Sequence, residues 1–309
     1  MAEASNTLAG LIQMNDMNLS DIEVSDLLQD APLLQVLNAE PASNGTEHKY
    51  LKQTLAPGVA FRDVNSGIAN AASQDTFVKV DLKLLDASFE RDKGLISEFK
   101  NGGDAFMARE AMRSIKEGLS NSEKQLINGT GNDADGNTGL ADTLSALSNG
   151  MVVGAGGAIV AKQTSVYAIR SGRDDVSAIM GNEGMIDMGE MYDTKVTTNT
   201  TGNVGFGAKR IDILAWMALQ MGSVFSAARL ANLDTVATLT DDLLSDVIAL
   251  FPAAKPPTHF VLNRQSLKQL QQSRTATNAT GAPAPFPTEA FGIPIVVTDS
   301  ITSTEAVVA

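Results

Sequence analysis

The segment that decides the fold is residues 55–82, LAPGVAFRDVNSGIANAASQDTFVKVDL. Its end alternates apolar and polar side chains over residues 77–82, which is typical of a strand with one covered face. Residues 65–67, Asn-Ser-Gly, supply turn chemistry ahead of that strand. Because residues 64–75 contain few large apolar side chains, we expect a long β-hairpin that projects from the body of the protein.

An amphipathic helix is expected after this hairpin. Asp104 follows two glycines and is a favourable N-cap residue, and apolar residues then recur at helical spacing. Ser120 and Glu123 have the spacing of a capping box, which predicts that a second helical turn starts there and ends at residues 128–131. The expected apolar face consists of Ala108, Ala111, Met112, Ile115 and Leu119.

The C-terminal half is predicted to mix strands and helices. Thr240 caps a helix that Pro252 stops, and a second helix runs through Leu267 into a loop over residues 271–287. Strands are predicted over residues 165–170, 211–225, 259–262 and 292–297. Pro294 places the last of them at a sheet edge. The fold class is therefore α+β with segregated elements, and not an alternating doubly wound sheet.

The N-terminal residues are predicted to form an acidic arm. Residues 1–48 contain eight acidic and no basic residues, whereas residues 49–124 contain twelve basic and eleven acidic ones. Prolines and glycine break any long helix in this arm. Its apolar cluster at residues 33–37 would be unfavourable in water, so we expect it to dock on a neighbouring copy. The alternative is a frayed terminus.

Composition excludes several classes of protein. Of the 309 residues, 43% are hydrophobic and 19% are charged, which is an ordinary globular balance. No apolar run approaches the roughly 18–20 residues of a membrane span, and the first 30 residues lack the basic region of a secretory signal. Cysteine is absent, which removes disulfides and thiolate metal sites. The net charge of −13 argues against a broad nucleic-acid-binding face.

Two segments resemble ligand-binding loops without matching them. Asp133, Asp135 and Asn137 stand at the first, third and fifth positions of a calcium loop, but Thr138 and Leu144 replace its required glycine and glutamate. An acidic turn is therefore the favoured interpretation. Residues 154–157, Gly-Ala-Gly-Gly, lack the Lys-Ser/Thr of a phosphate-binding loop and predict a permissive turn.

No catalytic constellation is found among the remaining polar residues. His48 and His259 have no nucleophile at a recognisable spacing. Pairs 174–175 and 241–242 are interpreted as a turn and a helix start, not as acid/base pairs. Met185, Met188 and Met191 are expected in the core or at interfaces, and Asn44 and Asn128 merely match glycosylation sequons. We therefore predict no catalytic, cofactor-binding or metal-binding residues and no cofactor.

Eight short motifs along the chain carry a family resemblance. In order, they are residues 55–67, 80–84, 125–131 with 139–140, 154–172, 216–219 with 229–234, 251–252, 262–264 and 291–294. Together they resemble the major capsid proteins of tailed bacteriophages, in a short-tailed subgroup. The fold of that family is the Hong Kong 97 type, which encapsulins share.

The resemblance implies four consecutive parts. These are an N-terminal arm (1–47), an extended loop (48–99), a spine helix with a peripheral domain (100–235) and an axial domain (236–309). It implies a coat protein that self-assembles, as hexamers and pentamers, into an icosahedral head shell around double-stranded DNA, without catalysis or sequence-specific DNA binding.

The partners implied are further copies of the chain, a portal, a scaffold and possibly a decoration protein, with no membrane. The implied location is the virion, after assembly in the cytoplasm of the host bacterium. Two alternatives remain open at this point. One is an encapsulin-like compartment that encloses protein cargo, and the other is an acidic, metal-dependent cytosolic enzyme using Asp133 or Asp135.

Overall fold

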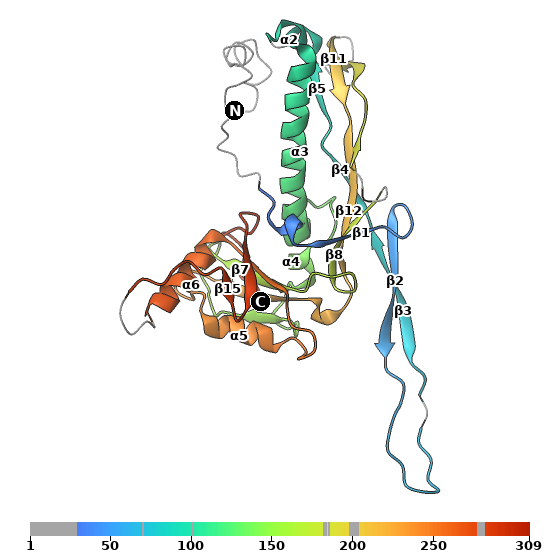
Figure 1. Ribbon diagram of the computed structural model, residues 1–309, viewed down its shortest axis with the longest axis vertical. Helices are drawn as coiled ribbons and strands as arrows, with labels where there is room; N and C mark the ends of the chain where they lie inside the picture. The colour runs from blue at the N-terminus through green and yellow to red at the C-terminus, as the bar shows by residue number, and fades with distance from the viewer. Residues whose placement is uncertain are drawn as a thin grey trace. The chain divides into compact units, whose positions relative to one another are not determined.

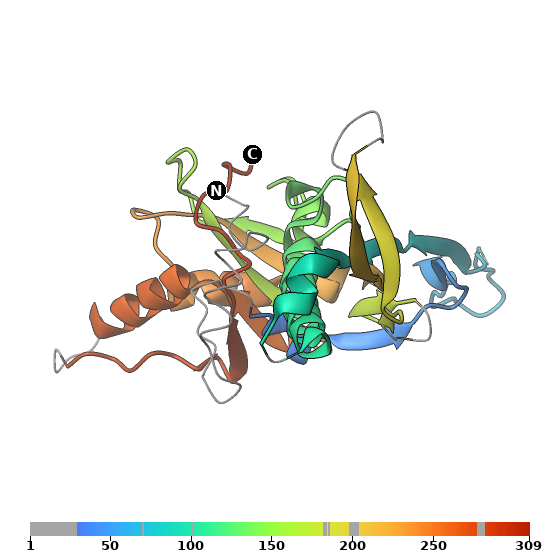
Figure 2. The ribbon, with the colours of Figure 1, turned by 90° about the horizontal axis from the view of Figure 1, so that it is seen from above.

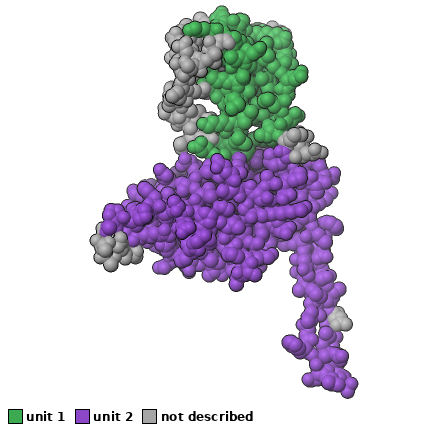
Figure 3. Space-filling model, viewed as in Figure 1, with its two compact units in different colours: residues 1–31, 84–123, 185–215 green, residues 32–83, 124–184, 216–309 purple. Residues whose placement is uncertain are grey.

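The computed structural model describes residues 30–69, 71–100, 102–181, 184, 186–197, 204–276 and 282–309. These residues fall into two compact units, coloured separately in Figure 3. Besides the N-terminal residues, the first unit contains Leu84–Glu123 and Met185–Ala215, and the second contains Pro32–Lys83, Lys124–Gly184 and Trp216–Ala309. Each unit therefore combines segments that are distant in the sequence.

The first unit packs helices on a small antiparallel sheet. Its strands are β5 (Phe89–Asp92), β10 (Tyr192–Thr197) and β11 (Gly205–Ile211), in the order β10–β11–β5. Strands β10 and β11 run side by side as a yellow pair in Figures 1 and 2. The helices are α2 (Lys93–Glu98) and the first part of α3 (Gly103–Asn128). Ile96, Phe99, Phe106 and Met107 form the buried cluster between them.

Helix α3 differs from the sequence prediction in three respects. It begins at Gly103, so Asp104 lies in its first turn and is not the N-cap. It is continuous to Asn128, so the buried Ser120 lies inside the helix and does not cap a new one. Its expected apolar face is also wrong, since Met112 and Leu119 are exposed.

The core of the second unit is a six-stranded mixed sheet in the order β15–β16–β14–β7–β13–β6. Every residue of the central strands β7 (Thr164–Ile169) and β13 (Ala227–Leu233) is buried. Because both faces of these strands are covered, their polar residues, such as Arg229 and Asn232, are buried and need partners within the protein. The other strands are β6 (Val152–Gly154), β14 (His259–Leu262), β15 (Glu289–Ala290) and β16 (Ile293–Val297).

The helices of this unit confirm one prediction and correct another. Helix α5 (Asp241–Ala249) is capped by Thr240, whose hydroxyl accepts from the Leu243 N–H at 3.4 Å. Helix α6 (Arg264–Ala276) extends into the segment predicted as a loop, and Thr275 Oγ1 donates to the Gln271 carbonyl within it. Residues 277–281 lie outside the described residues. A short helix, α4 (Leu140–Thr143), follows the end of α3.

The strand predictions at 165–170 and 259–262 are confirmed by β7 and β14. The predicted apolar strand at 211–225 corresponds mainly to β12 (Ile213–Met221). Pro294 does not make β16 an edge strand, because the two-residue β15 pairs beside it. The missing N–H of Pro294 is tolerated there, since the ladder to β14 begins one residue later at Ile295.

The hairpin prediction is confirmed. Strands β2 (Glu47–Leu55) and β3 (Gln74–Asp81) pair in antiparallel register, with Leu51 opposite Phe77 (Figure 1). The connecting residues 56–73 contain no strand among those described, and the chain leaves the rest of the second unit along this ribbon.

The N-terminal apolar cluster docks on its own chain, contrary to expectation. Leu33, in a short 3₁₀ turn (Leu33–Gln35), is 1% exposed and Leu37 is also buried. Directly afterwards β1 (Asn38–Pro41) pairs in parallel with β8 (Val176–Met180) of the same unit. The two remaining strands, β4 (Lys83–Asp86) and β9 (Asp187–Met188), both pair with β12.

Candidate functional site

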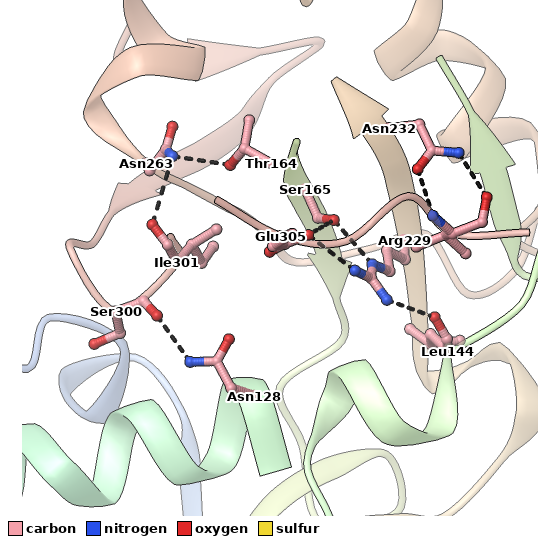
Figure 4. A network of polar contacts seen from close by, with 11 residues as sticks. Asn128, Leu144, Thr164, Ser165, Arg229, Asn232, Asn263, Ser300, Ile301 and Glu305 are labelled. Carbon is pink, nitrogen blue, oxygen red and sulfur yellow. Dashed lines mark hydrogen bonds and ion pairs between the residues drawn. The ribbon is translucent and has the colours of Figure 1, made fainter. Parts of the chain in front are cut away.

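A buried arginine organises a polar network of the second unit (Figure 4). Arg229 comes from the central strand β13 and is 5% exposed. Its guanidinium donates to Ser165 Oγ, to the Leu144 carbonyl and to Glu305 Oε2, each at 2.9 Å. A buried charge is strongly unfavourable unless it is paired and hydrogen-bonded, and Glu305 supplies the opposite charge. The guanidinium carbon also lies 5.6 Å from the centroid of the Tyr167 ring.

Three asparagines hold the rest of the C-terminal segment. Asn232 bonds Val308 in both directions at 2.8 Å, donating to its carbonyl and accepting from its N–H. Asn263 donates to Ser303 Oγ at 3.0 Å, and Asn128 donates to the Ser300 carbonyl at 2.9 Å. Figure 4 shows these side chains converging on the segment from different elements.

Residues 298–309 are thus fixed without forming a helix or a strand ladder. Their backbone joins the sheet at one bridge, where the Glu305 N–H donates to the Gln163 carbonyl at 2.9 Å. A hollow of about 560 Å³ lies between this segment and residues such as Lys124 and Asn128 of α3. These contacts hold residues 298–309 against the second unit, and Glu305 Oε2 also accepts a hydrogen bond from Ser165 Oγ at 2.5 Å.

The glycine-rich loop packs around a carboxylate, as a turn and not as a phosphate cradle. The Gly157 N–H donates to the Asn232 carbonyl at 3.0 Å, and a Cβ at this position would lie 2.4 Å from that oxygen. Asp234 accepts from the backbone N–H groups of Ala237 and Val236 at 2.7 Å. These donors hold the pKa of Asp234 below its usual range. Within the loop itself, the Ala155 and Gly157 N–H groups donate to the carbonyls of Ala231 and Asn232, and so they are not directed at a phosphate.

The side-chain amide of Gln125 holds the turn that resembles a calcium loop. Gln125 Nε2 donates to the carbonyls of Gly129, Asp133 and Asn137 at 3.0, 3.1 and 2.7 Å. Asp133 Oδ1 accepts from the Asp135 N–H at 3.0 Å, as in an ordinary acidic turn. The Gln125 amide thus holds this turn through its backbone carbonyls. In the described part of the chain, no group of three or more His, Asp or Glu side chains is arranged to hold a metal ion.

The other singled-out polar residues have structural partners. His48 Nδ1 accepts from the Ser43 N–H at 3.2 Å, and burial lowers the pKa of His259 in β14. Asp175 pairs with Arg170 at 2.6 Å, and Asp241 starts α5 and pairs with Arg274. The structure does not bring these residues together into one site.

The predicted methionine group is only partly described. Met188 and Met191 are exposed, so they do not fill a core, and Met185 lies outside the described residues. No helix in the described ranges is both long and apolar enough to cross a membrane.

A cluster of four charges marks the base of the hairpin. Glu47 pairs with Lys49 at 2.9 Å and with Lys79 at 2.6 Å, and Lys79 also reaches Asp81 at 2.9 Å. Hydrogen bonds to Glu47 and Asp81 raise the pKa of Lys79 to about 12. All four residues lie on one face of the ribbon, because they occupy alternate positions in directly paired strands.

Large apolar side chains follow on the same ribbon. Leu51 is 56% exposed and its cross-strand partner Phe77 is 78% exposed. Phe61 is fully exposed in the connecting loop, close to a turn in which the Arg62 guanidinium donates to the Ser66 carbonyl at 2.8 Å. The loop therefore presents apolar groups on an ordered turn, as an interaction surface would.

Sequence reasoning missed Arg229, Glu305 and Gln125 as organising residues. A signal for Arg229 exists, because it is the one charged residue in the otherwise uncharged strand AARLANL. A buried strand with a charge requires a partner, but the sequence alone does not say that Glu305 supplies it.

Comparison with solved structures identifies the fold. A chain from a structure of bacteriophage epsilon15 superposes with a TM-score of 0.70 at 18% identity, covering 100% of this chain and 99% of its own. A chain of the bacteriophage JBD30 capsid decorated with minor capsid protein trimers gives 0.55 at 10% identity, covering 96% and 99%. The holo-SrpI encapsulin of Synechococcus elongatus gives only 0.46 at 12% identity, covering 72% and 95%, which is too low to carry an argument.

The fold is therefore that of the shell proteins of tailed-phage capsids, of the Hong Kong 97 type. A search of curated proteins finds no match. The sequence model of the family described as major capsid protein GP7 matches residues 17–309, and the chain belongs to this family. It is a structural protein of the virion capsid, where it assembles with further copies into the shell.

Proposed function

We propose that the chain assembles as pentamers and hexamers into a closed icosahedral shell around double-stranded DNA. Assembly takes place in the cytoplasm of the host bacterium, and the subunit performs no catalysis. A shell needs many modest contacts that symmetry closes, and multivalency makes the closed particle far more stable than any single pair.

The observation that carries this proposal is the exposed apolar surface of the hairpin. Leu51, Phe61 and Phe77 are all exposed in the single subunit. Fully burying one such side chain against a neighbour contributes about 1.5–3 kcal/mol. A projecting two-stranded ribbon with an apolar surface is marginally stable in water and is suited to being covered by another copy.

Charge supports the same arrangement. Residues 47–83 contain five basic and four acidic residues, a net charge of +1, and the rest of the chain then carries −14 to give the total of −13. The hairpin is thus a part of the subunit that an otherwise acidic neighbour does not repel.

We take the four parts implied by the family resemblance as the functional parts of the shell subunit. The arm (1–47), the extended loop (48–99), the spine helix with the peripheral domain (100–235) and the axial domain (236–309) supply separate surfaces to neighbouring copies. Because Leu33 and Leu37 are buried on their own chain, they are not among the residues proposed to contact a neighbour.

The proposal also includes partners other than copies of the chain, namely DNA and other particle proteins. An acidic inner surface lets DNA move without sticking and gives no sequence preference, since phosphate binding depends on Lys and Arg. A portal, a scaffold and a decoration protein complete the particle. The decoration of the JBD30 capsid by minor capsid protein trimers supports the last of these.

Shortening the hairpin tests the proposal. Residues 56–73 are replaced by Asn-Gly, which joins the paired residues Leu55 and Gln74 by a favourable two-residue turn. We expect a folded subunit with an unchanged Tm that forms no shells in negative-stain microscopy. The control Gln53→Ser changes an exposed polar residue of β2 and should assemble normally. Normal shells from the shortened chain would refute the role of the hairpin.

A further inference from the structure

A bulky residue in a strained conformation stands at the edge of the six-stranded sheet. Phe291 has φ of +54°, in the left-handed region that disfavours large side chains. Three other non-glycine residues in the described chain share this sign of φ. Two are asparagines, which tolerate it, and the third is the small Ala161, also at +54°.

The turn geometry explains the strain. Ala290 and Ile293 pair directly across β15 and β16, so Phe291 and Gly292 form a two-residue hairpin loop. Both have positive φ, at +54° and +75°. This combination is typical of a type I′ turn, which favours Asn-Gly and not Phe-Gly. Local structure alone therefore gives no reason for an aromatic residue at position 291.

Packing within the subunit does not compensate for the backbone strain at Phe291. Phe291 is 59% exposed, and Phe286, which precedes β15, is 61% exposed. Two aromatic side chains thus flank a strand of only two residues with much of their surface in water. Large exposed aromatic groups are the kind that supply most of the binding energy at protein interfaces.

We propose that Phe291 is an anchor through which the β15–β16 turn binds a second copy of this chain. The inference rests on the self-assembly described above and names one contact that assembly uses. The strain in the free subunit is offset when a neighbour buries the ring.

Charge near the turn favours a second copy as the occupant. Copies that each carry −13 repel one another, so they meet best where local charge is small. Arg274 Nη1 donates to the Glu289 carbonyl at 3.3 Å, and two bonds to Asp241 at 2.7 and 2.8 Å balance its charge, which leaves the exposed Glu289 carboxylate as the charge next to the turn. An apolar ring near an exposed carboxylate offers nothing to a phosphate backbone.

The variant Phe291→Asn separates strain from assembly, because Asn-Gly is ideal for this turn. We expect the Tm of the dilute subunit to be unchanged or raised by about 1–4 °C, since left-handed strain is removed. The subunit concentration needed for half-maximal assembly should rise about tenfold or more. The control Ala161→Gly removes the same strain without removing an aromatic ring and should leave assembly unchanged.

Assembly of Phe291→Asn at the wild-type concentration would overturn the proposal. A clear fall in its Tm would also do so, because it would show that the ring packs within its own subunit. Failure of the wild-type chain to form particles at any salt concentration would instead refute the proposed function.

A second measurement decides the contact independently of shell formation. The full chain carrying Phe291→p-benzoylphenylalanine is illuminated in cells that produce the other particle proteins. A cross-linked product of twice the mass of the chain supports the proposal. A product with another protein, or no product, overturns it.

Discussion

At the scale of single residues, the buried Arg229 holds the C-terminal segment against the second unit. Arg229 is surrounded by apolar strand residues, and its charge is balanced by Glu305, 76 positions later in the sequence. Removing one partner of a buried ion pair costs more than removing both, because the remaining charge stays buried without compensation. The family motif that contains Arg229 is thus explained by an anchoring role and needs no chemical one.

The variant Glu305→Gln tests this role. It keeps the size of the side chain but leaves Arg229 without an anion, so we expect a loss of about 3 kcal/mol in the free energy of unfolding. Urea titration followed by the fluorescence of Trp216, the single tryptophan, measures it. The control Glu40→Gln removes a 4.0 Å contact to the exposed Arg173 and should cost less than about 1 kcal/mol. Equal effects in the two variants would contradict the argument.

At the scale of elements, tight turns fix the long segments that carry the assembly surfaces. The loop between β6 and β7 approaches the end of β13 so closely that residue 157 has no room for a side chain. The end of helix α3 is also held by a tight turn. There the Gln125 side-chain amide donates to three backbone carbonyls. Gly157 in the first of these turns and Gly129 and Gly139 in the second therefore allow close backbone packing.

The variant Gly157→Ala should destabilise the subunit by about 1–3 kcal/mol, because its Cβ would lie 2.4 Å from the Asn232 carbonyl oxygen. Thermal unfolding of the dilute subunit measures the change. The matched variant Gly67→Ala adds the same methyl group where nothing lies within 4 Å, and it should leave the Tm unchanged. A neutral Gly157→Ala would show that this loop is free to move.

At the scale of the whole molecule, association must overcome the charge of the subunit. Each copy carries −13, whereas the surfaces proposed for contact expose apolar side chains and carry little net charge. Apolar contacts persist in salt, but repulsion between exposed charges is screened as the Debye length falls from about 10 Å at 0.1 M to about 3 Å at 1 M.

Raising NaCl from about 0.1 M to about 1 M should therefore lower the subunit concentration needed for assembly. Light scattering during a dilution series measures that concentration. Shells that dissolve when salt is added would contradict the prediction, since they would be held mainly by ion pairs between copies.

The sequence by itself determined the elements whose causes are local. Alternation over residues 77–82 predicted strand β3, and the cap at Thr240 predicted the start of α5. The strand predicted at residues 259–262 is β14. The order of its motifs also indicated the family. Side-chain periodicity, turn residues and caps act between near neighbours in the chain, so the sequence displays them directly.

Only the tertiary structure decided which partner each residue meets. It turned Met112 and Leu119 of α3 outward, placed Leu33 on its own subunit and joined Arg229 to Glu305. A helical pattern tells which residues share a face but not what covers that face. A buried charge likewise requires a partner, but packing between distant segments selects which residue it is.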